Sequence, residues 1–127
     1  ISECLVGSEM CIRDRYTGTH DNDTVMGWYD TLKGADKKLC DDYLRLKNAD
    51  GEPIPREQLP WEFVRAAMSS VADLAIIPMQ DYLGLGSEAR INIPSTLGIN
   101  WKWRMGNGDF TKELAGRIRS MTKLYGR

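Results

Sequence analysis

The chain has 127 residues, of which 42% are hydrophobic and 28% are charged, and its formal net charge is −1. This size and balance are typical of one globular domain and exclude a large two-domain enzyme. No apolar run approaches the ~18 residues of a membrane span, so no membrane association is expected. The three cysteines, Cys4, Cys11 and Cys40, form no Cys-x-x-Cys pair. We therefore expect neither a disulfide framework nor a zinc ribbon, and a reducing, cytoplasmic location.

Residues 1–15, ISECLVGSEMCIRDR, show no sustained helical or strand periodicity. The stretch resembles the translation of sequencing-adapter DNA, and we predict that it is a non-native leader. One domain is then expected over residues 16–127.

The first elements of this domain are predicted to be a strand and two helices. A strand end at residues 16–19 leads into a short helix capped by Asp23 or Thr24. A second helix is expected over residues 35–46, followed by a turn rich in glycine and proline. The apolar positions that share one face of this helix are Leu39, Tyr43 and Leu46.

The second half of the domain begins with a helix for which Pro60 suits the first turn. Its apolar stripe comprises Trp61, Val64, Met68 and Val71. Residues 74–77, LAII, are predicted to form a strand buried on both faces, as in a parallel sheet. A loop is expected over residues 87–109, and a last helix over residues 111–125. The apolar face of that helix comprises Leu114, Ile118, Met121 and Tyr125. This order predicts an α/β fold.

Both predicted strands end in polar residues, His20 and Asp21 on the first, Gln80 and Asp81 on the second. The carboxyl ends of parallel strands face the active site, so a carboxylate there is a candidate for contact with a substrate. A metal site is not expected, because His20 is the only histidine and no second ligand cluster follows. For Asp23, helix capping is favoured over ligand binding. On these residues alone, functional and structural roles for Asp21 both stay open.

Tryptophan and basic residues give weaker indications. Trp61 falls in the helical stripe and is predicted to be core. Trp101 and Trp103 lie two apart in the loop, where they either line a groove or plug the fold, and the pattern favours the plug. Residues 87–127 carry eight basic and three acidic side chains. A solvated helix face is favoured over a nucleic-acid surface, because no binding motif accompanies the charge.

Several of these residues belong to longer motifs. YTGTHDNDT at residues 16–24 and QDYLGLGSEAR at residues 80–90 resemble the C-terminal part of amylomaltases, the 4-α-glucanotransferases of the α-amylase clan (glycoside hydrolase family 77). The similarity covers nearly all of residues 16–127, and it also includes Gly27-Trp28-Tyr29, Pro60-Trp61, Ser70-Val71-Ala72, Ile77-Pro78-Met79, Asn92, Pro94, Asn100-Trp101 and Trp103-Arg104.

The resemblance implies the C-terminal portion of a (β/α)8 barrel, with residues 16–19 ending the seventh strand and residues 74–77 in the eighth. It also implies a retaining double displacement that passes α-1,4-glucan segments to a sugar 4-hydroxyl. The substrate would be a maltooligosaccharide or α-glucan, and no cofactor is expected. Asp21 then matches the transition-state stabiliser, His20 a contact to the sugar hydroxyls, and Asn92 a substrate-binding position.

By the same resemblance, Gln80, Asp81 and Arg90 are expected to brace the loop after the eighth strand, from which Asn92 reaches the substrate. The nucleophile and the acid/base of the family lie on earlier strands, and this chain contains neither segment. A barrel needs about 250 residues and eight strands, whereas two strands are predicted here. We therefore expect a fragment that is inactive alone, with the remainder of its barrel missing. One alternative is a free-standing carbohydrate-binding or interaction module without catalysis, and another is a half-barrel that self-assembles.

Overall fold

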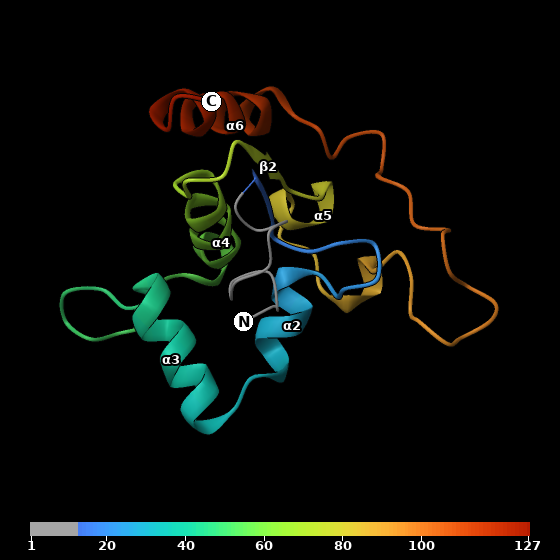
Figure 1. The fold of residues 1–127 in the computed structure, drawn as a ribbon, viewed down its shortest axis with the longest axis horizontal. Coiled ribbons are helices and arrows are strands. Elements are labelled where there is room, and N and C mark those ends of the chain that lie inside the picture. Colours follow the sequence, from blue (N-terminus) through green and yellow to red (C-terminus); the bar gives the residue numbers. More distant parts are fainter. Residues whose placement is uncertain (1–12) are drawn as a thin grey trace.

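A computed structural model describes residues 13–127 of the chain (Figure 1). Most of the predicted leader, including Cys4 and Cys11, lies outside the described residues. Helices make up most of the regular structure around one short sheet. The elements in chain order are β1 (Asp14–Tyr16), α2 (Val25–Thr31), α3 (Gly34–Leu44), the 3-10 turn η2 (Arg56–Gln58), α4 (Leu59–Met68), β2 (Leu74–Ile76), α5 (Met79–Tyr82), the 3-10 turn η3 (Ser87–Ala89) and α6 (Lys112–Leu124).

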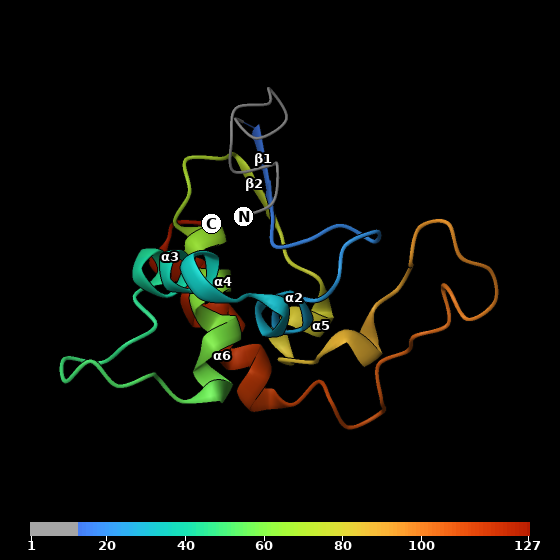
Figure 2. The same cartoon turned by 90° about the horizontal axis from the view of Figure 1, so that it is seen from below.

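The two strands form a parallel pair, in which Tyr16 is the register partner of Ile76. They lie side by side in Figure 2, and α2, α3 and α4 connect them along the chain. This arrangement confirms the predicted α/β organisation, because parallel neighbours need a crossover connection. The first strand lies earlier than expected, and it includes two residues of the predicted leader, Asp14 and Arg15.

The prediction that residues 74–77 are buried on both faces is wrong for this chain. Leu74 is 49% exposed and Ile76 is 43% exposed. Each strand has one paired neighbour in the described sheet, and a two-stranded sheet offers no further strands or covering layers to exclude water from these side chains.

One apolar cluster lies among α2, α3 and the start of α4. Its buried members are Val25, Met26, Tyr29, Cys40, Leu44, Leu46 and Leu59. The predicted face of the second helix is therefore wrong at two positions, since Leu39 is 57% exposed and Tyr43 is 65% exposed. Helix α3 instead turns Cys40 and Leu44 inward toward the neighbouring helices. Leu46 is buried as predicted, although it lies beyond the end of α3.

A second cluster forms where α6 crosses α4 (Figure 1). Its buried members are Trp61, Val64 and Met68, and the predicted apolar face of α6 packs against them. Burying a side chain such as Val64 stabilises a fold by about 1.5–3 kcal/mol. The prediction that Val71 belongs to the apolar stripe is wrong. Helix α4 ends at Met68, and Val71 is 91% exposed.

The helix ends are fixed by side chains. Thr24 caps α2 by accepting a hydrogen bond from the Gly27 amide at 3.1 Å, which decides between the two predicted caps. Thr111 caps α6 in the same way. At the other end of α6, Arg127 donates hydrogen bonds to four backbone carbonyls of the α4–β2 connection, those of Met68, Ser70, Ala72 and Asp73. Within residues 13–127, no helix combines the length and apolarity needed to span a bilayer.

Candidate functional site

The loop between β1 and α2 presents His20 and Asp21 at a tight turn. Asn22 closes this turn, because its side-chain oxygen accepts hydrogen bonds from the amide and hydroxyl of Thr19 at 2.8 and 2.9 Å. The His20 side chain is 54% exposed and the Asp21 side chain 49% exposed. His20 Nε2 lies 3.3 Å from Asp21 Oδ1. The turn thus holds an imidazole and a carboxylate together and open to solvent.

A second loop, which follows η3, reaches the same carboxylate. Asn92 Nδ2 donates a hydrogen bond to Asp21 Oδ1 at 2.6 Å. Arg90 binds the backbone carbonyl of Asp21 at 2.7 Å and that of Asn92 at 2.9 Å. The structure therefore brings together all three predicted site residues, although Asp21 and Asn92 are 71 positions apart in the chain. Arg90 braces both loops, as the resemblance implies.

Asp81 anchors the site loop, which is the loop between β1 and α2 (residues 17–24). The side chain is 2% exposed, and it accepts hydrogen bonds from the Thr17 hydroxyl at 2.5 Å and the Val25 amide at 2.9 Å. Burial raises the pKa of this carboxyl above its usual value, although the hydrogen bonds from Thr17 and Val25 act in the opposite direction. Asp81 therefore ties both ends of the loop to α5, and each of its two oxygens accepts one of these hydrogen bonds.

Two further side chains hold the region together. Gln80 Nε2 donates to the Ala89 carbonyl at 3.2 Å, which fixes the turn between α5 and η3. Asp23 accepts hydrogen bonds from the Ser87 hydroxyl at 2.6 Å and the Thr24 amide at 2.8 Å. Gln80 thus braces the segment after β2 as expected, whereas Asp81 braces the other loop, between β1 and α2. Asp23 links α2 to η3.

Trp101 also belongs to the site, although the sequence pattern favours a position that plugs the fold. Its ring lies against His20, with the centroids 5.1 Å apart and the planes tilted by 37°. Trp101 is 56% exposed, so it fills no core. The plug that the pattern favours is therefore wrong for Trp101, which instead packs against His20 at the surface. The sequence signal for Trp101 was its place in the Asn100-Trp101 pair, which is part of the family resemblance. The spacing of residues in the loop does not indicate a contact with His20.

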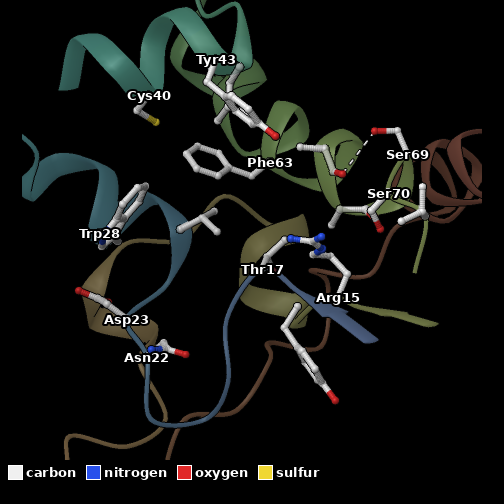
Figure 3. Close-up of a pocket in the computed structure, with 16 residues that line it drawn as sticks. Arg15, Thr17, Asn22, Asp23, Trp28, Cys40, Tyr43, Phe63, Ser69 and Ser70 are labelled. Atoms are coloured by element: carbon white, nitrogen blue, oxygen red, sulfur yellow. Dashed lines mark hydrogen bonds between the residues drawn. The ribbon is translucent and has the colours of Figure 1, made fainter. Parts of the chain in front are cut away.

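Two hollows flank the site loop. One of about 420 Å³ is lined by His20, Arg90 and Asp81, among other residues, and lies at the carboxyl end of both strands. The other, of about 460 Å³, lies behind the loop and has a largely apolar wall. Figure 3 shows Trp28, Tyr43 and Phe63 projecting into it from α2, α3 and α4.

The chemistry of the site rests on one accessible carboxylate. Asp21 Oδ1 is bound by Asn92, whereas Oδ2 accepts no hydrogen bond from any residue between 13 and 127. Such an oxygen can accept hydrogen bonds from the hydroxyls of a ligand. Across the part of the chain that the structure describes, no group of three or more His, Cys, Asp or Glu side chains has a metal-binding arrangement.

Comparisons with known proteins identify relatives of the whole segment. A family model described as 4-alpha-glucanotransferase matches residues 10–110, which begins within the predicted leader. The chain is 47% identical over 113 residues to a 4-alpha-glucanotransferase of Clostridium butyricum, covering 88% of this chain and 22% of that protein. It is 44% identical over 110 residues to a 4-alpha-glucanotransferase of Thermus thermophilus, covering 85% and 21%.

A solved structure shows the same relation. The amylomaltase from Streptococcus agalactiae in complex with acarbose matches 96% of this chain and 25% of its own, with a TM-score of 0.80 and 29% sequence identity. The chain spans about a fifth of the length of the curated relatives that it matches. The sequence and structural matches agree in kind and in extent: this chain belongs to the 4-alpha-glucanotransferase family.

Proposed function

We propose that the chain is the part of a 4-α-glucanotransferase that binds the transferred sugar and stabilises the transition state. The observation that carries this proposal is the position of Asp21 at the end of two parallel strands in a member of this family. Asn92 binds its carboxylate, and Arg90 binds its backbone carbonyl. The substrate would be a maltooligosaccharide or another α-1,4-glucan. The acarbose bound to the amylomaltase of similar structure supports this class.

The proposed role of Asp21 follows from the charge that develops during glucanosyl transfer. The sugar ring distorts and becomes positive in an oxocarbenium-like transition state. As the ring becomes positive, the hydrogen bonds from its hydroxyls to a fixed carboxylate strengthen. These bonds therefore stabilise the transition state more than the ground state. Asn92 fixes this carboxylate in advance, Arg90 fixes the backbone that carries it, and His20 would contact a hydroxyl of the same ring.

We further propose that the nucleophile and the acid/base belong to other segments of a complete (β/α)8 barrel. Three features support this interpretation: Leu74 and Ile76 of β2 are about half-exposed, an apolar hollow lies behind the site loop, and the relatives are about four times as long as this chain. Exposed strands and apolar faces of this kind are normally covered by neighbouring strands and helices. The 127-residue chain is then inactive alone, and its cytoplasmic location remains a prediction.

The decisive experiment replaces Asp21 with asparagine in the complete enzyme, meaning the longer protein that this proposal implies. Asparagine keeps the size of the side chain and an oxygen that can accept from Asn92, but it removes the charge. We expect the turnover of maltotriose to fall by about 10²–10³-fold or more, as when a preorganised electrostatic contact is lost. Asp50→Asn, in an exposed turn, is the matched control.

Two results would contradict the proposal. Near-normal turnover of the Asp21→Asn enzyme, with Asp50→Asn also unchanged, would exclude the assigned role of the carboxylate. Release of glucose from maltotriose by the isolated 127-residue chain would show that the fragment interpretation is wrong.

A further inference from the structure

The His20 imidazole has little polar support within the described residues. Its Nε2 approaches Asp21 Oδ1 at 3.3 Å, but no hydrogen bond of good distance and angle fixes the ring within residues 13–127. The side chain is also 54% exposed. An imidazole in this situation can rotate about two torsions unless another group restricts it. The aromatic contact with Trp101 is the restriction that the structure provides.

Trp101 is itself held in a specific backbone conformation. Its φ of 64° lies in the left-handed region, which a bulky residue seldom adopts without support. The Trp101 amide donates a hydrogen bond to the Ile91 carbonyl at 2.7 Å, and Arg104 donates to the Trp101 carbonyl at 3.3 Å. This geometry turns the indole toward His20 instead of into the core.

The neighbouring Asn100 closes the same loop. Its side-chain oxygen accepts from the Ile93 amide at 3.0 Å, and its amide group donates to the Thr96 carbonyl at 3.1 Å. The loop is therefore anchored immediately beside both residues that reach the first loop, Asn92 and Trp101. One anchored segment thus supports the carboxylate through Asn92 and the imidazole through Trp101.

We propose that Trp101 is a positioning residue that sets the orientation of the His20 ring for its contact with the sugar. The inference rests on the proposed function, and it adds a residue that acts through His20 instead of on the substrate. Aromatic pairs contribute enough free energy that loss of one changes an equilibrium by about 3- to 10-fold. We expect a loss of that size in kcat for maltotriose when the ring is removed.

The test is a double-mutant cycle in the complete enzyme. Trp101→Ala, His20→Ala and the double variant are compared by glucose release from saturating maltotriose. If Trp101 acts through His20, its removal costs about 3- to 10-fold alone but less than about 2-fold when His20 is already alanine, because the interaction partner is gone. Trp101→Phe, which keeps a ring, should recover most of the loss. Leu97→Ala, fully exposed in the same loop, is the control.

Trp101→Leu is a second probe that preserves bulk without a ring, so the comparison of Phe with Leu stands even if the alanine variant misfolds. Equal activity of these two variants would overturn the inference, as would losses that simply multiply in the double variant. Multiplying losses would indicate that Trp101 contacts the sugar directly or has a general structural role. No glucose release by the unmodified complete enzyme would instead overturn the proposed function, and this inference with it.

Discussion

Replacing Asp81 tests how the site loop is held. Asp81→Ala removes the acceptor for the buried Val25 amide and for the Thr17 hydroxyl. Leaving a buried donor without a partner costs about 1–3 kcal/mol, and the second, half-buried donor adds a smaller amount. We expect a local destabilisation of about 2–4 kcal/mol at the start of α2. At 1.4 kcal/mol for each factor of ten, this corresponds to roughly 30- to 1,000-fold faster exchange of the affected amides.

Asp81→Asn is the informative comparison. Its amide oxygen can accept from Val25, and its NH2 group can donate to the Thr17 hydroxyl, which rotates to accept. We therefore expect exchange within about 5-fold of the unmodified protein, equivalent to less than about 1 kcal/mol. Hydrogen exchange followed by mass spectrometry on peptides that contain α2, in the complete enzyme, measures both variants. Peptides from α6, which makes no hydrogen bond to Asp81, give the internal control.

The pH dependence supplies a second measure of the same contact. Burial raises the pKa of Asp81 in the folded state, so the folded protein binds a proton more readily than the unfolded chain. The contribution of this group to stability therefore declines as pH rises from the ordinary carboxyl value through the raised pKa, and it is recovered in acid. Asp81→Asn lacks this titration. Its protection relative to the unmodified protein should be greatest at neutral pH and should decrease as the pH falls.

Two outcomes would refute this reasoning. If Asp81→Ala leaves exchange in α2 unchanged, the hydrogen bonds to Thr17 and Val25 do not anchor the loop. If Asp81→Asn is as damaging as Asp81→Ala, the negative charge matters more than the two hydrogen bonds.

Three further predictions concern other contacts. Arg90→Lys should lower kcat for maltotriose by about 10-fold or more, because an ammonium cannot bind the Asp21 and Asn92 carbonyls in the same planar fork. Kinetics of the complete enzyme, with Arg119→Lys as the control, measure this change. Normal turnover of the Arg90→Lys enzyme would contradict the prediction. Burial raises the pKa of the Cys40 thiol, so its labelling by a thiol reagent at neutral pH should be slow until denaturant is added; rapid native labelling would contradict its position in the core. Arg127→Ala should lower the denaturation midpoint of the complete enzyme, detectable by calorimetry, because four backbone carbonyls lose their donor.

Some of the fold could be predicted from local chemistry. The apolar face of α6 and the burial of Trp61 follow from helical periodicity, and Thr24 is a residue type that caps helices. Tyr43 was assigned to the wrong side because more than one helical face of α3 carries apolar residues, and packing against α2 and α4 selects among them. Ile76 was predicted to be buried because its apolar run is typical of a strand that has neighbours on both sides, and this sheet has two strands.

The site was predictable to a different extent. The motifs identified His20, Asp21 and Asn92, and the structure places them together, although their roles remain proposals. The contact of Trp101 with His20 was not predictable, because it depends on the left-handed backbone conformation of Trp101. Glycine adopts this conformation readily, whereas a tryptophan adopts it only when the surrounding structure supports it. Spacing within the loop carries no information on such a conformation.

The bonds that define the site join residues far apart in the chain. Asp81 binds Thr17 across 64 positions, and Asn92 binds Asp21 across 71. Closing loops of this length costs conformational entropy that short-range contacts do not have to overcome. The site geometry should consequently be acquired late in folding, after α2, α3 and α4 have brought the two strands together. Catalytic activity would then report on completion of this segment's folding, whereas helical content would recover earlier.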